Sequence, residues 1–444
     1  MSARFTIPKL RWIIAGLLLA VTMINYTDRL TLSVLIGHVR KDLTLSETDY
    51  SQVVSLFLAA YAIMYAVSGW VVDRLGTRHG FTLFVGGWSV AQMLHGLAWD
   101  KWSLGGFRFL LGLTEPGSFP AAVKAVREWF PTEQRAIGVG LFNTGSALGA
   151  ALAAPLAASL GLRYGWRAAF VVTGALGLVW LVFWLALYQP PQKNRWLSQS
   201  EAAELGAVMA EAPAGPTGTR VDWKRVLISR PCLVLMLARF LADPVIYFVI
   251  FWLPAYLQKE RGFDLEMIGR YAWIPYVFGG FGYVVGGWLS GRLLRAGWSL
   301  CGARKLALAA GAALLPTAIL APLVPSAGLA IAASSVVVFG HAVWVANLLT
   351  LPADLFPGGE VGTASGFSGM AGSVGGILAN LGTGYIVSTF SYLPVFIAAG
   401  LLHPVAFVVL WRLLRRGDFD PACGSPGPAS PTDQGLPGRL PSRG

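Results

Sequence analysis

Twelve apolar segments, each about 20 residues long, follow one another along the chain, and a helix of about this length crosses the hydrocarbon core of a bilayer. Because backbone polar groups find no water in that core, spanning segments of this length fold as helices. The pattern therefore predicts an all-α integral membrane protein with twelve transmembrane helices. The predicted spans are approximately 11–37, 52–73, 80–98, 104–127, 135–160, 167–188, 231–257, 269–292, 304–324, 327–351, 362–389 and 392–414.

The composition supports a membrane setting. Hydrophobic residues make up 55% of the chain and charged residues only 13%, whereas a soluble domain carries about 25% charged residues. The net charge of +12 could suggest nucleic-acid binding, but the basic residues gather in short loops on one side of the spans. That asymmetry places both termini and the long central loop in the cytoplasm. We expect a lipid bilayer, in a bacterial inner membrane, and no nucleic acid as a partner.

The longest polar interruption, residues 189–230, divides the spans into two sets of six. We therefore expect an N-terminal six-helix bundle (1–188), a cytoplasmic linker (189–230), a C-terminal six-helix bundle (231–416) and a disordered tail (417–444). The halves also repeat, because Gly69–Arg74 (GWVVDR) resembles Gly287–Arg292 (GWLSGR). Parallel repeats of this kind place a substrate site at the midplane between two halves that rock against each other.

Four ionisable residues interrupt the apolar pattern: Asp28 and Arg29 in the first span, and Arg108 and Glu115 in the fourth. A charge at the bilayer centre costs about 3 kcal/mol even on lenient scales, so such residues usually face a protein interior or a watery cavity. Guanidinium groups bind carboxylates through two parallel hydrogen bonds. The pattern predicts a buried chamber for an organic anion. The alternative is a static ion pair of Arg29 with Asp28 or Glu115 that only holds helices together.

Several motifs resemble known transporters. The stretch Gly69–Gly80 (GWVVDRLGTRHG) is similar to the loop signature between the second and third helices of the major facilitator superfamily. Within that superfamily the chain resembles the anion:cation symporter family, and its hexuronate transporters in particular, from about residue 10 to residue 415. The motifs that carry this second resemblance are NYTDR (25–29), RFLLGLTEPGSFPAAVKAVREWFP (108–131), RFLADP (239–244), GHAVWVANLLTLPADLFP (340–357) and SGMAGSVGGIL (368–378).

The resemblance implies a secondary transporter that takes up a sugar acid together with protons by alternating access. It implies that Arg29 and Arg108 bind the substrate carboxylate and that Asp28 and Glu115 carry protons. Further expected substrate contacts are Tyr26, Tyr61, Tyr65, Trp344 and Asn347. Expected gating residues in the loop signature are Gly69, Asp73, Arg74, Gly76 and Arg78. In the second copy Gly291 replaces the acid, so we expect the C-terminal half to lack that part of the gate.

Other functions stay open at this point. Coupling could use sodium, and the substrate could be another organic anion, such as an aldonate, an aromatic acid or a dicarboxylate. A membrane receptor or sensor that binds a ligand without moving it is a different class. We expect no enzyme and no cofactor, because the chain has no phosphate-binding loop, nucleophile elbow or metal-ligand cluster. We also expect a monomer, and we expect Arg239 and Asp243, four residues apart, to pair with each other.

Overall fold

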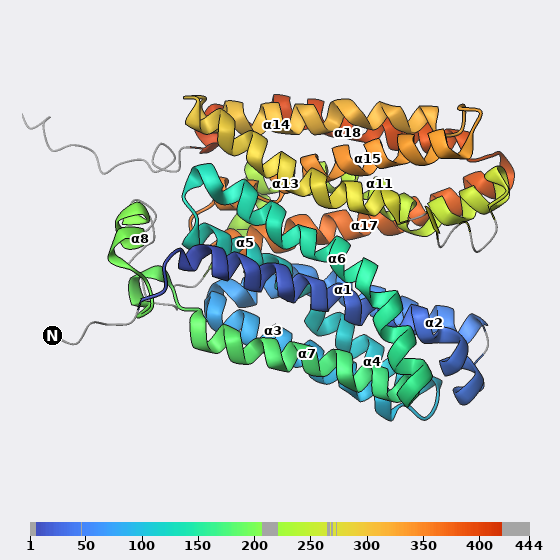
Figure 1. Ribbon diagram of the computed structural model, residues 1–444. Coiled ribbons are helices and arrows are strands. Elements are labelled where there is room, and N and C mark those ends of the chain that lie inside the picture. The colour runs from blue at the N-terminus through green and yellow to red at the C-terminus, as the bar shows by residue number, and fades with distance from the viewer. Residues whose placement is uncertain are drawn as a thin grey trace, which may run out of the picture.

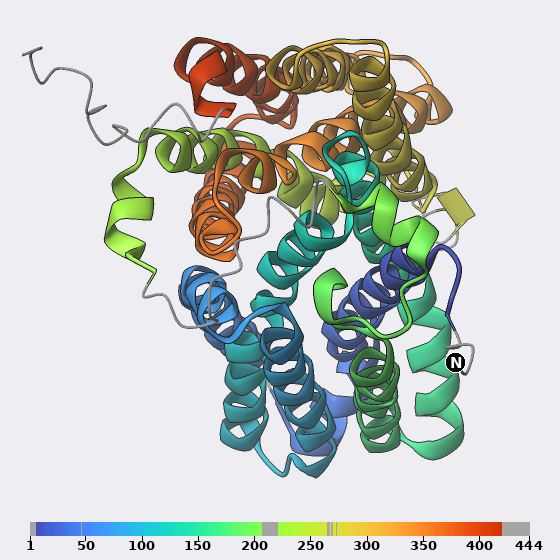
Figure 2. The ribbon, with the colours of Figure 1, turned by 90° about the vertical axis from the view of Figure 1, so that its left-hand side faces the viewer.

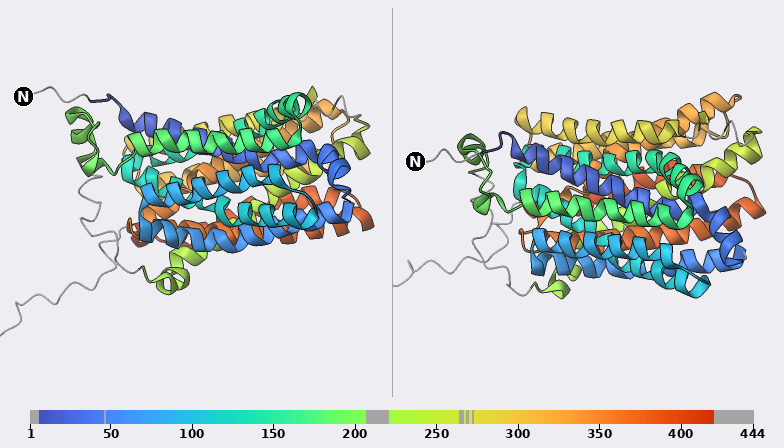
Figure 3. Two further views of the ribbon diagram at one scale, coloured as in Figure 1. Left: turned by 90° about the horizontal axis from the view of Figure 1, so that it is seen from below. Right: turned by 60° about the horizontal axis from the view of Figure 1, so that its bottom comes forward.

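The computed structural model describes residues 6–45, 47–206, 221–263, 267, 270–271 and 273–419. Nearly all of these residues are helical, and the helices share one long direction (Figure 1, Figure 3). Nine of the described helices are long and apolar enough to cross a membrane. Three further helical segments match the remaining predicted spans: α3 (Thr77–Leu94), the broken segment α4–α5, and α13 (Ile274–Arg295).

The first six spans pack in one half of the molecule (Figure 1). Their helices are α1 (Leu10–Leu43), α2 (Glu47–Leu75), α3, α4 (Lys101–Thr114) with α5 (Ser118–Trp129), α6 (Thr132–Tyr164) and α7 (Trp166–Leu187). The fourth span is broken at Glu115–Gly117, where a single 3₁₀ turn separates α4 from α5. Pro116 lies in that turn, and a proline both removes a backbone donor and clashes with the preceding turn. The break places Glu115 at a bend in the middle of the span.

The other six spans form the second half. They are α11 (Arg230–Arg261), α13, α14 (Leu300–Leu314) continued by η4 (Leu315–Leu320), α15 (Ala327–Leu348), α17 (Val361–Thr389) and α18 (Leu393–Leu413). Short segments connect these elements. They are η1 (His95–Leu97), η3 (Pro191–Lys193), α8 (Gln199–Glu204), α10 (Trp223–Ile228), α16 (Leu351–Leu355) and η5 (Arg416–Phe419). The predicted linker continues through residues 207–220, which lie outside the described residues. The disordered tail was predicted to begin at residue 417, but residues 417–419 belong to η5, and 420–444 lie outside the described residues.

We call the end of the helix array where α1 begins and where α2 and α18 end the terminal face; it lies at the left in Figure 1 and toward the viewer in Figure 2. The segment that connects the two halves includes α8, which packs against the start of α1 at this face. Glu201 of α8 is buried, and its carboxylate accepts hydrogen bonds from the backbone N–H groups of Leu10 at 2.7 Å and Arg11 at 3.1 Å. An acid at this position accepts hydrogen bonds from the free donors at the start of α1 and interacts favourably with the helix dipole.

Two seams join the halves: α2 packs against α17, and α6 packs against α13. Glycines let the backbones meet there. A Cβ atom on Gly69 of α2 would lie 2.0 Å from the carbonyl oxygen of Gly362 of α17. A Cβ atom on Gly287 of α13 would lie 2.5 Å from the carbonyl oxygen of Ala136 of α6. Both contacts lie toward the terminal face, so the halves are pressed together on that side. Small residues are the usual means of such close helix packing in membranes.

We expect Gly69→Ala to destabilise the protein by about 1–3 kcal/mol, because the added methyl group overpacks a backbone contact. Gly16→Ala is the matched control, since nothing lies within 4 Å of a Cβ atom at Gly16 of α1, and alanine favours a helix more than glycine does. Thermal unfolding of the purified variants in detergent measures the difference. Equal midpoints for Gly69→Ala and Gly16→Ala would show that the seam tolerates a side chain.

Candidate substrate site

The centre of the candidate site is an ion pair between two spans. Arg29 of α1 donates from Nε to Oε1 of Glu115 over 3.0 Å. Glu115 is at the break between α4 and α5, and its side chain is only 1% exposed, whereas that of Arg29 is 23% exposed. A static partnership with Glu115 was one of the alternatives, and this pairing is the one that the structure contains. The Nη2 atom of Arg29 is buried and has no hydrogen-bond partner among the described residues, so the guanidinium has donor capacity left for a ligand.

Aromatic rings surround the same guanidinium. The Cζ atom of Arg29 lies 4.7 Å from the ring centre of Tyr61, 5.1 Å from that of Tyr26 and 5.8 Å from that of Phe57. These separations are within cation–π range. Tyr65 follows one turn after Tyr61, and their ring centres lie 5.5 Å apart. The structure therefore brings together the three tyrosines that the sequence predicted as substrate contacts.

Arg108 lies next to this group. Its Nη2 atom donates to the backbone carbonyl of Arg29 over 2.9 Å, and its Cζ atom lies 4.7 Å from the Phe57 ring centre. The buried Nε and Nη1 atoms of Arg108 have no hydrogen-bond partner among the described residues. A buried guanidinium with unused donors is costly to maintain. It adds positive charge and donor capacity beside Arg29.

Asp28 points elsewhere. The idea that it neutralises Arg29 is not what the structure shows, because neither carboxylate oxygen accepts a hydrogen bond from a described residue. The carboxylate lies near Thr173 of α7 and Trp88 of α3 inside the first half. Gln92 of α3 donates to both the Asp28 carbonyl and the Thr173 hydroxyl. Asp28 is fully buried, and its role in proton transfer stays a prediction.

Trp344 and Asn347 of α15 are also fully buried. The Trp344 ring packs against His403 of α18, with ring centres 5.4 Å apart. The Asn347 amide donates to the backbone carbonyls of Gly286 and Val343. The structure thus packs both side chains between helices of the second half, and their contact with a substrate stays a prediction.

The predicted gating residues lie at the terminal face. Asp73, at the end of α2, pairs with Lys124 of α5 at 2.8 Å. Its carboxylate also crosses to the second half, where it accepts hydrogen bonds from the backbone N–H of Gly362 and from the N–H and hydroxyl of Thr363. These groups are at the start of α17, where free backbone donors and the helix dipole favour a carboxylate. Asp73 is therefore a contact that holds the two halves together.

Three other residues of the loop signature, Arg74, Gly76 and Arg78, lie within the first half. Arg74 lies over the ring of Trp70, with its Cζ atom 5.4 Å from the ring centre. Arg78 donates to the carbonyl of Leu185 in α7. Gly76 has a φ of 79° and precedes α3, a conformation that favours glycine. It allows the chain to turn sharply from α2 into α3.

A second contact between the halves at this face was not predicted from the sequence. Asp354 of α16 accepts a hydrogen bond from Arg304 of α14 at 2.7 Å and from Arg135 of α6 at 3.2 Å. Arg304 also donates to the carbonyl of Thr132, and Arg127 donates to the carbonyl of Ala353. The three charged side chains are almost completely buried. Charged residues were assigned to loops from the sequence, and only the fold shows which of them meet.

This second contact corrects the expectation about Gly291. A Cβ atom there would lie 2.5 Å from the carbonyl oxygen of Glu133 of α6, so no acid fits at that position. The second half nevertheless contributes an acid to the closure, because Asp354 supplies it from α16. The two halves close the terminal face with different residues.

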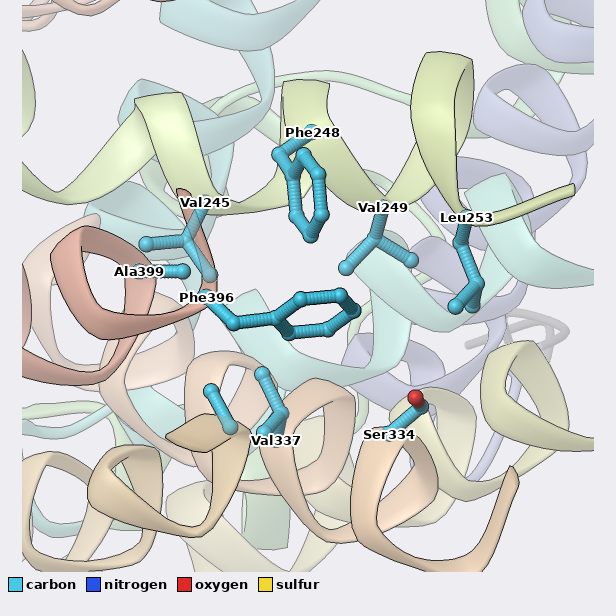
Figure 4. A pocket seen from close by; sticks show the side chains of 9 residues that line it. Val245, Phe248, Val249, Leu253, Ser334, Val337, Phe396 and Ala399 are labelled. Carbon is cyan, nitrogen blue, oxygen red and sulfur yellow. The ribbon is translucent and has the colours of Figure 1, made fainter. Parts of the chain in front are cut away.

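An apolar pocket lies inside the second half (Figure 4). Its residues come mainly from α11, α15 and α18, and Ser334 provides its only labelled hydroxyl. The lining residues are Val245, Phe248, Val249, Leu253, Ala318, Ser334, Val337, Phe396 and Ala399. Burying a charged sugar acid there would leave its carboxylate unpaired, which is very unfavourable. The Arg29 region is the better candidate for an anion.

The chain is similar to known transporters over most of its length. The sequence profile of the Major Facilitator Superfamily matches residues 18–380. The chain is 31% identical over 410 residues to the hexuronate transporter of Escherichia coli K12, covering 92% of this chain and 95% of that protein. It is also 31% identical over 393 residues to the probable galactarate/D-glucarate transporter GarP of Escherichia coli K12, covering 85% of this chain and 88% of that protein.

Solved structures show the same fold at low sequence identity. The transporter FucP in its outward conformation superposes with a TM-score of 0.69 at 15% identity, covering 92% of this chain and all of that one. The proton:xylose symporter XylE, bound to 6-bromo-6-deoxy-D-glucose, gives a TM-score of 0.70 at 14% identity and covers 91% of this chain and 96% of that one. The predicted two-bundle arrangement of twelve spans is thereby confirmed.

Proposed function

We propose, from the premise that the chain belongs to the Major Facilitator Superfamily, that it imports a sugar acid such as a hexuronate together with protons. In this proposal Arg29 binds the substrate carboxylate, and Arg108 adds positive charge beside it. Tyr26, Tyr61 and Tyr65 contact the hydroxyl-bearing carbons. The similarity to hexuronate and galactarate/D-glucarate transporters supports a sugar acid as the substrate class.

One observation carries the proposal: Arg29 pairs with Glu115, a proton-accepting group, and still has an unpaired donor, Nη2. A bound carboxylate competes with Glu115 for the guanidinium, because both are planar acceptors of the same donors. When Arg29 turns to the substrate, Glu115 loses its counter-charge and takes up a proton more readily. Substrate binding and protonation thus favour each other, which is what symport requires. Asp28 is the second candidate proton carrier.

In this proposal the contacts at the terminal face control the movement of the two halves. We propose that this face is cytoplasmic and that the contacts of Asp73 and Asp354 close it while the site is open to the outside. Releasing both contacts lets the halves rock apart on the cytoplasmic side and delivers the substrate. The seams of α2 with α17 and of α6 with α13 would be the surfaces that separate.

Uptake by purified protein in liposomes tests the proposal. We expect D-glucuronate to accumulate when the external solution is more acidic than the lumen, and a proton ionophore to abolish the accumulation. Uptake that survives the ionophore but requires sodium would show that sodium, and not the proton, is the coupling ion. A ligand that binds without ever accumulating would support a receptor instead. Transport of other organic anions, with no sugar acid taken up, would contradict the substrate class.

A further inference from the structure

A second ion pair lies at the boundary between the halves, and the function proposed above does not use it. Arg239 and Asp243 of α11 pair as predicted: Nε and Nη2 of Arg239 both donate to Oδ2 of Asp243, over 2.9 and 2.6 Å. Their side chains remain 13% and 9% exposed. The pair has no net charge, but it offers strong donors and a strong acceptor side by side.

The surroundings of this pair place it toward the first half. A Cβ atom on Gly372 of α17 would lie 2.0 Å from Oδ2 of Asp243, and one on Gly369 would lie 2.0 Å from the Tyr65 ring. The ion pair of the second half and the tyrosine of the first therefore lie against the same helix, about one turn apart. The Cζ atom of Arg239 lies 6.0 Å from the Tyr65 ring centre.

The two ion pairs belong to one region. Arg29 contacts Tyr61 at 4.7 Å, Tyr61 contacts Tyr65 at 5.5 Å, and Tyr65 contacts Arg239 at 6.0 Å, each measured to a ring centre. Tyr26 is close enough to interact electrostatically with all four charged residues of the two pairs. A ligand bound at Arg29 and lying along these tyrosines would reach toward Arg239 and Asp243.

We propose that the Arg239–Asp243 pair binds the hydroxyl end of the substrate and that Asp243 selects acids with one carboxylate over acids with two. This inference rests on the proposed function. Hydroxyls can donate to Asp243 and accept from Arg239 without breaking the pair. A second carboxylate at that end would lie beside the Asp243 carboxylate, and like charges in a poorly solvated site repel strongly. Hexuronates have one acid group, whereas galactarate and glucarate have two.

Competition against labelled D-glucuronate uptake in proteoliposomes tests the selection. For the wild type, we expect unlabelled D-glucarate to compete about tenfold or more weakly than D-glucuronate, as a repulsion above about 1.4 kcal/mol requires. The 6-monoamide of D-glucarate has nearly the same shape as D-glucarate but only one negative charge. We expect it to compete almost as well as D-glucuronate. In Asp243→Asn the difference between D-glucarate and D-glucuronate should shrink about tenfold.

Asp42→Asn is the matched control, because Asp42 also pairs with an arginine, Arg167, but at an exposed site outside this region. It should leave the competition ratios unchanged. Ratios measured on the same liposomes do not depend on how much protein is folded. If Asp243→Asn does not fold, the comparison of D-glucarate with its monoamide on the wild type still decides.

Equal competition by D-glucarate, its monoamide and D-glucuronate on the wild type would overturn the selection while leaving the proposed function intact. An unchanged ratio in folded Asp243→Asn would also overturn it. A wild type that takes up no sugar acid would overturn both the selection and the proposed function.

Discussion

We expect Arg29→Ala to raise the KM for sugar-acid uptake about 30-fold or more. Truncating one partner of a buried, hydrogen-bonded charge contact typically costs about 2–5 kcal/mol of binding, and each 1.4 kcal/mol is about tenfold. Among the described residues, Arg29 pairs with Glu115, and the rings of Tyr26 and Tyr61 lie around it. Without the Arg29 guanidinium, Arg108 is the group of opposite charge that remains near the substrate carboxylate. Initial uptake rates over a range of substrate concentrations give KM.

Two variants sharpen this test. Arg29→Lys keeps the charge but loses the planar pair of donors, so its KM should fall between those of the wild type and Arg29→Ala. Arg167→Ala is the control, because Arg167 belongs to the same half and pairs with Asp42 at an exposed site, where ion pairs contribute little. Its uptake should match the wild type. An unchanged KM in Arg29→Ala would remove Arg29 from the site.

We expect Asp354→Ala to destabilise the protein by about 3–5 kcal/mol, the usual cost of removing one partner from a buried ion pair. Arg304 and Arg135 would lose their shared carboxylate, and both are almost completely buried. The closure of the terminal face should weaken at the same time, because Arg135 belongs to the first half and Asp354 to the second. Thermal unfolding of the purified variant measures the loss of stability.

A double variant separates charge from packing. In Asp354→Ala with Arg304→Met, one unpaired buried charge is replaced by an apolar side chain of similar length. The combined loss should then be smaller than the sum of the two single losses. Additive losses would show that Asp354 and Arg304 do not stabilise the protein through each other.

The spans were predictable from the sequence because the bilayer sets their length. All twelve predicted segments are helical among the described residues, although α1 runs to Leu43, beyond the predicted end at residue 37. The pairing of charges was less predictable. Asp28 and Arg29 are adjacent in the sequence, and adjacent residues on a helix do not face each other. Their side chains therefore point to different neighbours, Asp28 toward α3 and α7 and Arg29 toward Glu115.

Contacts between the halves were the hardest to predict. Asp73 belongs to a recognisable motif, but the motif does not say that the start of α17 will receive its carboxylate. Asp354 lies in the motif at residues 340–357, but the motif did not predict a role for it. Its partners Arg135 and Arg304 come from segments far away in the chain. The Arg239–Asp243 pair was predictable because its partners lie one helical turn apart.

The glycine contacts between Gly69 and Gly362 and between Gly287 and Ala136 also bear on speed. Where two helices meet through interlocking side chains, separating them means that many rotamers must change and repack, and that slows the motion. Bare main chain against main chain has no rotamers to rearrange. The barrier to rocking should then depend on how fast a few hydrogen bonds and ion pairs break, and turnover should respond to changes at Asp73 and Asp354 far more than to changes among the neighbouring apolar residues.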